Sequence, residues 1–166
     1  TSSPNDNVII EGVSGTDNSY GWVGFAFAEE NSDVVREIEV AGEDGTCVAP
    51  SVDTIADGSY PLSRPLFIYV NADKAAENPA LAAFVDYYTG DAGYAAVSDA
   101  GYVQMPEEDF AAAIAAWEDA GGTPGEPESG VSGEVIISGS STVEPISSAA
   151  AEGFARHSGT PLGQGL

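Results

Sequence analysis

The sequence predicts an α/β fold in which helices flank a sheet. One observation is the apolar run at residues 66–70, which does not alternate with polar residues and is typical of a strand covered on both faces. The others are two helical patterns, one that begins with Asn78 and Pro79 and one that follows Pro106. Strands and helices that follow one another in this way indicate a layered α/β domain.

The first sixty residues predict two strands between two short helical segments. The strands are expected at residues 21–28, a glycine-punctuated aromatic run, and at residues 34–40, where valine and isoleucine are frequent. A short helix capped by Asp6 or Asn7 is expected before them, and a helical turn capped by Ser51 after them.

The middle of the chain predicts two amphipathic helices. Pro79 occupies the first position of one helix, and Gly90 is expected to end it. The second helix carries acidic residues at 107–109, in the first turn, where the helix dipole favours negative charge. Its apolar stripe, expected in the core, consists of Phe110, Ile114 and Trp117.

Composition divides the chain into three parts. Residues 121–130 lack large apolar side chains and are rich in glycine, proline and glutamate, which is typical of a linker. We therefore expect a domain portion at residues 1–119, a linker at residues 120–133, and the start of a second unit at residues 134–166.

The second unit predicts a strand at residues 134–138, a turn of small polar residues, and a helix from about Val143. Ser140, Ser141 and Thr142 lie in the turn. The first turn of a helix presents unpaired N–H groups and a partial positive charge, so these hydroxyls and amides can coordinate an oxyanion without a basic residue. The turn is therefore the candidate anion site.

The same turn also has a purely structural interpretation. Ser141 and Glu144 have the spacing of a capping box, in which each side chain accepts a hydrogen bond from the backbone of the other. Glu144 also places a negative charge near any bound anion. Spacing alone leaves capping and anion binding open, and different hydroxyls could serve each.

Charge excludes one class of function. The chain has 27 Asp and Glu against 4 Lys and Arg, a net charge of −23. Such a field repels nucleic-acid phosphates and anionic lipid surfaces, so nucleic-acid binding is excluded. No run of about 20 apolar residues occurs, so no membrane span is expected. The acidity fits a salty or extracellular environment, or a general means of staying soluble.

Catalytic and cofactor signatures are absent from the sequence. It contains no dinucleotide-binding, P-loop, zinc-protease or nucleophile-elbow motif, so we expect no catalytic residue, no cofactor and no metal site. The single histidine, His157, lies in an unpatterned tail. The single cysteine, Cys47, cannot form an intrachain disulfide, and we expect a buried free thiol.

Several segments resemble one known family, the phosphate-binding proteins of ABC transporters (PstS family). The segments that resemble its late-chain part are residues 5–13, 21–27, 57–70 and 101–106. Residues 133–146 instead resemble the start of its mature domain, where a Gly-Ser-Ser-Thr-Val turn supplies amide and hydroxyl donors to phosphate. The resemblance carries that role to Ser140, Ser141, Thr142 and Val143.

The resemblance implies a partial periplasmic-binding-protein-like (type II) domain with a mixed sheet flanked by helices. It also implies a protein without catalytic activity that captures inorganic phosphate and delivers it to the membrane permease of an ABC importer. The implied location is periplasmic or extracellular, with a membrane anchor in a segment that this sequence lacks.

The order of the segments departs from the family, because the late-chain part comes before the early one. The central loop, arginine and aspartate that complete the family's phosphate site are also not found. A window from a tandem protein, a gene fragment, or a circular permutant without its middle would each give this order. The alternative functions are an acidic interaction protein, a non-binding fragment in which the turn only caps a helix, and a phosphatase that uses the turn.

Overall fold

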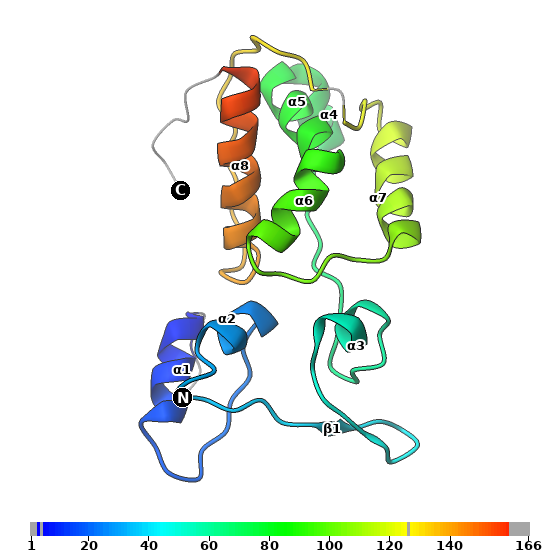
Figure 1. Ribbon diagram of the computed structural model, residues 1–166. Helices are drawn as coiled ribbons and strands as arrows, with labels where there is room; N and C mark the ends of the chain where they lie inside the picture. The colour runs from blue at the N-terminus through cyan, green and yellow to red at the C-terminus, as the bar shows by residue number, and fades with distance from the viewer. Residues whose placement is uncertain (1–2, 4, 126, 160–166) are drawn as a thin grey trace.

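The computed structural model describes residues 3, 5–125 and 127–159, and helices dominate it (Figure 1). Helices α1–α3 and a small hairpin lie at one end of the molecule, and α4–α8 gather at the other. The elements are α1 Asp6–Ser14, α2 Phe25–Glu30, β1 Val40–Ala41, β2 Cys47–Val48, α3 Val52–Ala56, α4 Ala72–Glu77, α5 Pro79–Tyr88, α6 Asp91–Asp99, α7 Glu107–Asp119 and α8 Glu144–Ser158.

Side-chain caps start α1 and α3. The expected cap of α1 is wrong by one position, because Asn5, and not Asp6 or Asn7, has the extended backbone of a cap and accepts the N–H of Asn7 at 3.0 Å. The predicted turn after Ser51 is confirmed as α3. Its capping box pairs Ser51 with Thr54 in both directions.

Helices α5 and α7 confirm the two amphipathic patterns. Asn78 caps α5 and Pro79 opens it, while the acidic first turn of α7 follows Pro106. Of the predicted α7 stripe only Trp117 is fully buried. α5 ends just before Gly90, as expected: Thr89 is its C-cap, and Gly90 follows and also caps the start of α6. Helices α4 and α6 were not predicted from the sequence.

The mixed sheet expected from the sequence does not form among the described residues. The sheet there is a two-stranded antiparallel ladder in which Val40 pairs with Val48 and Ala41 with Cys47. The strands predicted at residues 21–28, 66–70 and 134–138 are wrong, and only the end of residues 34–40 enters a strand. Residues 25–28 belong to α2 instead, and residues 66–70 and 134–138 pair with no other strand within the described chain.

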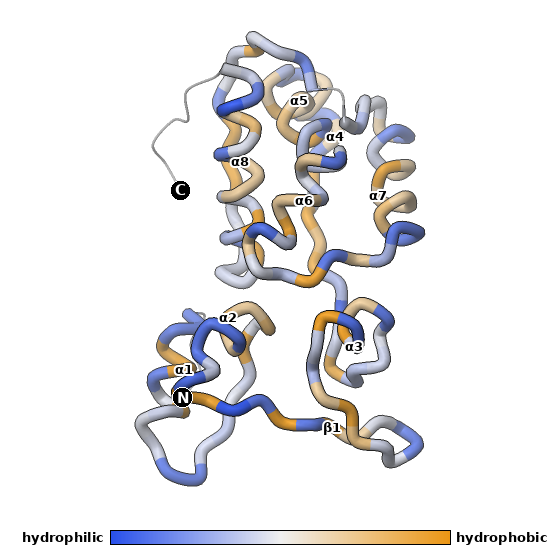
Figure 2. The backbone as a smooth tube through the Cα atoms, in the orientation of Figure 1, coloured by the Kyte–Doolittle hydropathy of each residue, from blue (hydrophilic) through white to orange (hydrophobic). Residues whose placement is uncertain are grey.

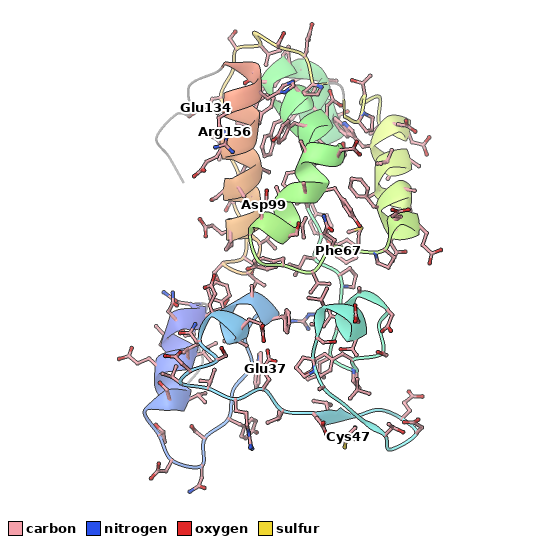
Figure 3. All side chains as sticks on the ribbon, in the orientation of Figure 1. Glu37, Cys47, Phe67, Asp99, Glu134 and Arg156 are labelled. Carbon is pink, nitrogen blue, oxygen red and sulfur yellow. The ribbon has the colours of Figure 1, made fainter. Side chains whose placement is uncertain are left out.

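Cys47 is exposed on β2, so the buried thiol expected from the sequence is also wrong (Figure 3). Within the described residues, no helix combines the length and the apolar character needed to cross a membrane.

The main core lies between α5 and α8. It consists of Ala83, Phe84, Ala150 and Phe154, and the rings of Phe84 and Phe154 meet edge to face with centroids 5.8 Å apart. Ala150 is completely buried and Ala83 is 1% exposed, so small side chains let the two helices approach closely. The helix after the linker therefore packs directly on the helices before it. The division at residues 120–133 stays a prediction.

A second cluster fixes α7 and the first part of the linker. Ala75, Val85 and Trp117 pack together, and the buried carboxylate of Asp86 accepts the indole N–H of Trp117 at 2.7 Å. The same carboxylate accepts the Thr123 N–H at 2.7 Å and its hydroxyl at 3.2 Å. Three donors satisfy this buried charge, so residue 123 is held on α5.

Candidate functional site

A hollow of about 470 Å³ at the start of α8 contains the predicted turn. Ser140, Ser141 and Thr142 line it, and Gly139 lies beside them. Two polar residues at the start of the chain, Ser3 and Asn5, form its other wall. The hollow therefore lies between the N-terminal ends of α1 and α8, both of which carry partial positive charge.

The backbone of the turn is already ordered by Ser140. Its hydroxyl oxygen accepts the N–H of Thr142 at 3.2 Å. Its carbonyl oxygen accepts the N–H groups of Val143 at 3.0 Å and Glu144 at 3.2 Å. Three amides that an anion could use are thus occupied in this structure, including that of the predicted ligand Val143.

Other donors of the turn remain available. Within the described part of the chain, the N–H groups of Gly139 and Ser140 and the hydroxyl of Thr142 make no hydrogen bond. The Ser140 hydroxyl accepts one bond and can still donate its own proton. The hollow can therefore offer two amides and two hydroxyls to an oxyanion.

The capping box expected between Ser141 and Glu144 is not formed. Val143 is the cap residue of α8, and among the described residues no side chain caps it. The Glu144 carboxylate instead accepts the hydroxyl of Ser148 at 3.0 Å, one turn further along the helix. The purely structural interpretation of the serine at position 141 as a box residue therefore fails.

Carboxylates surround this end of the molecule. Asp6 is only 8% exposed, and its Oδ2 atom has no hydrogen-bond partner among the described residues. Burial raises the pKa of its carboxyl above the ordinary value. The hydroxyl of Tyr102 is also buried, and it too has no partner in the described part of the chain. Burial, with the charges of Asp6, Glu30 and Glu144 nearby, raises the pKa of Tyr102 to about 12. Any anion here must be held by short-range hydrogen bonds against an unfavourable field.

Ser3 and Asn5 were not predicted as wall residues of the hollow. Asn5 precedes an apolar helical pattern, and this local signal is enough to indicate a helix cap. That Asn5 and Ser140 line the same hollow depends on the tertiary fold. Gly24, the cap of α2, also lies against the turn, since a Cβ there would contact the Thr142 methyl at 3.4 Å. No group of three or more His, Cys, Asp or Glu among the described residues is placed to hold a metal.

Comparisons with known proteins agree with the resemblance seen in the sequence. A family model described as a PBP superfamily domain matches residues 10–92, half of the chain. The chain is 38% identical over 104 residues to the phosphate-binding protein PstS of Staphylococcus saprophyticus, which covers 63% of this chain and 32% of that protein.

The phosphate-binding proteins PstS of Staphylococcus haemolyticus and Staphylococcus aureus are also 38% identical over 104 residues, covering 63% of this chain and 33% and 32% of their own. The chain thus spans about a third of the length of the curated relatives it matches. A comparison with solved structures finds no match.

Proposed function

Because the chain belongs to the PBP superfamily, we propose that it is part of a solute-binding protein that captures inorganic phosphate for the permease of an ABC importer. The likeness to proteins named as phosphate-binding supports the choice of ligand. The periplasm or the cell exterior is the proposed location, since solute must be captured before it crosses the membrane.

Within this chain, the proposed phosphate ligands are Ser140, Ser141, Thr142 and Val143. The observation that carries the proposal is the hollow at the start of α8, whose lining includes Gly139, Ser140 and Thr142, the residues with available amide and hydroxyl donors. The N–H groups of Gly139 and Ser140 and the Thr142 hydroxyl can bind first. The amide of Val143 joins them only if the anion replaces the carbonyl of Ser140, which it now contacts.

Hydrogen bonds can overcome the negative field at this site. Each bond to a charged group contributes about 1.5–3 kcal/mol, so several together outweigh repulsion from carboxylates that salt screens beyond about 8 Å. Binding is therefore expected to strengthen as salt is added, the opposite of a site that relies on lysine or arginine.

Calorimetric titration of the 166-residue chain with phosphate tests the proposal, with sulfate as the comparison anion and circular dichroism to confirm folding. We expect saturable phosphate binding that a Thr142→Val substitution weakens about tenfold, because it removes one hydroxyl donor and keeps the methyl group. The control is Thr16→Val at an exposed position, which should leave affinity unchanged.

A folded chain that gives no phosphate heat contradicts the proposal that this turn binds phosphate by itself. It would favour instead the acidic interaction protein or the fragment in which the turn has no ligand. Turnover of a generic phosphate ester in the same samples would favour the phosphatase.

A further inference from the structure

A buried carboxyl lies next to the proposed phosphate site. Asp6 is the first residue of α1, and its neighbour Asn5 lines the hollow. The start of α1 is coloured as hydrophilic and lies below the turn that leads into α8 (Figures 1 and 2). Because neighbouring Cα atoms are about 3.8 Å apart, the Asp6 carboxyl lies within about 10 Å of an anion held against Asn5. Two charges at this separation affect one another.

The chain itself buries this carboxyl. Asp6 is 8% exposed, and its Oδ2 atom is buried without a hydrogen-bond partner among the described residues. Chain that packs on the outside of the molecule cannot reach a covered atom, so further parts of a longer protein would keep or increase this burial. A carboxylate that loses water and gains no hydrogen bond is disfavoured relative to the neutral carboxyl. Burial therefore raises the pKa of Asp6.

The titratable groups around Asp6 are also acidic. The hydroxyl of Tyr102, between α6 and α7, is buried, and burial together with the charges of Asp6, Glu30 and Glu144 raises the pKa of Tyr102 to about 12. Glu30 comes from α2 and Glu144 from the start of α8. Neither ion pair within the described residues involves Asp6. A proton on the Asp6 carboxyl would therefore lower the negative charge beside the hollow.

We propose that phosphate binding in the hollow is coupled to protonation of the Asp6 carboxyl. This inference rests on the phosphate site proposed above and adds a means of regulating it. An anion beside Asn5 brings negative charge close to Asp6, so the neutral form of Asp6 is favoured and one of its carboxyl oxygens takes a proton from the buffer. Because coupling between two sites is reciprocal, protonation of Asp6 strengthens anion binding by the same factor.

The sign of the pH effect follows from the charge of Asp6 in the free and bound states. At low pH Asp6 is neutral in both states, so affinity is greatest and binding takes up no proton. At high pH Asp6 is ionised in both states, and affinity is lowest. Between these limits binding takes up a proton, and affinity falls as the pH rises. Two unit charges about 10 Å apart change affinity by about two- to fifteenfold, depending on how strongly water screens them.

Asp6 is not a phosphate ligand in this proposal, because the described residues that line the hollow do not include it. Its effect on the anion acts through charge alone. Exposed carboxylates such as that of Asp17 are screened by water and salt. Asp6 differs from them because it is buried, lies close to the hollow and can change its charge when the anion binds.

Calorimetric titration of the chain with inorganic phosphate, in two buffers that differ in their heat of ionisation, counts the protons taken up on binding. The titrations run from about pH 5 to about pH 6.5, above the ordinary carboxyl pKa. We expect wild type to take up protons and to bind about two- to fifteenfold more tightly at the lower pH. Asp6→Asn is neutral at every pH, so it should show less proton uptake and a smaller change of affinity. The control, Asp17→Asn at an exposed position, should match wild type.

A second measurement needs no variant. The NMR signal of the Asp6 carboxyl, followed against pH with and without phosphate, should give a higher pKa when phosphate is present. Equal proton uptake in wild type and Asp6→Asn, or an Asp6 pKa that phosphate leaves unchanged, overturns the coupling and leaves the phosphate site intact. No phosphate heat from folded wild type overturns both proposals, so the two failures are distinguishable.

Discussion

The indole N–H of Trp117 donates to the buried carboxylate of Asp86 at 2.7 Å, across 31 positions of the chain. Asp86 is 6% exposed and Trp117 is 7% exposed, so this bond forms out of contact with water. Through the same carboxylate, the backbone of Thr123 is attached to α5. One side chain therefore links α5, α7 and the beginning of the linker.

Replacing Asp86 with alanine should lower the free energy of unfolding by about 3 kcal/mol, because it leaves the indole and amide donors buried without partners. Urea unfolding followed by tryptophan fluorescence measures the loss, since Trp117 is buried and Trp22 is 77% exposed. Asp119→Ala, at an exposed carboxylate, is the control and should cost less than about 0.5 kcal/mol. Equal losses in both variants would show that the buried carboxylate is dispensable.

Two helix glycines should respond in opposite directions to alanine. A Cβ at Gly93 would overlap the backbone carbonyl of Tyr88, where α6 turns back on α5, and backbone cannot move aside cheaply. A Cβ at Gly12 of α1 would meet no atom within 4 Å. We expect Gly93→Ala to destabilise by about 2 kcal/mol and Gly12→Ala to stabilise by up to about 1 kcal/mol in thermal unfolding. A Gly93→Ala variant with the same melting temperature as wild type would contradict the close approach of Gly93 in α6 to the backbone of Tyr88 in α5.

Asp6 should make stability fall as the pH rises. Burial raises the pKa of its carboxyl in the folded state above the ordinary value of 3.8, so the folded state holds the proton more tightly than the unfolded state. The contribution to stability is therefore greatest below the ordinary pKa and is lost as the pH rises through the folded pKa. Asp6→Asn should remove this dependence.

Urea titrations of wild type and Asp6→Asn from about pH 3.5 to pH 7 test the sign of the effect. The difference between them should move in favour of the variant as the pH rises. Asp17→Asn, at an exposed position, should run parallel to wild type. A difference that moved the other way would mean that the Asp6 carboxylate has a stabilising partner.

Added salt should stabilise the fold. The described residues contain two ion pairs, Lys74 with Glu77 at 3.0 Å and Arg156 with Glu152 at 3.7 Å, and all four side chains are exposed. Such exposed pairs contribute little to the free energy of unfolding. The excess carboxylates that give the net charge of −23 repel one another throughout the folded chain. The melting temperature should rise between about 0.05 M and 1 M NaCl, and also with choline chloride if screening is the cause. A falling melting temperature would contradict this account.

Helices whose signals are local could be predicted from the sequence. The caps Ser51 and Asn78 and the acidic start of α7 each act within one turn, and a helix satisfies its own backbone. α4 was not predicted, although Asn71 caps it, because the apolar run just before it is typical of a strand. Gly90 marks the end of α5, as glycine commonly does, and it also begins α6, which its local signal does not reveal.

Strands could not be predicted in the same way. The apolar runs at residues 21–28, 66–70 and 134–138 indicate burial or pairing, but the partner of a strand lies elsewhere in the sequence and sets whether the strand forms. The candidate site shows the same contrast between local signals and contacts that are distant in the sequence. The turn before α8 could be predicted from Ser140 and Thr142, whereas the presence of Asn5 in the lining of the same hollow depends on residues far apart in the sequence.

The packing of α8 on α5 should not depend on an unbroken chain at the linker. Thr123 is bound to Asp86 on one side, Glu134 is bound to Asn78 on the other, and residues 128–130 between them are exposed. The covalent connection there chiefly raises the effective concentration of α8 near its partner helices. A cut at residues 128–130 should therefore yield two pieces that recognise each other, so the protein can be divided into complementing fragments at this point.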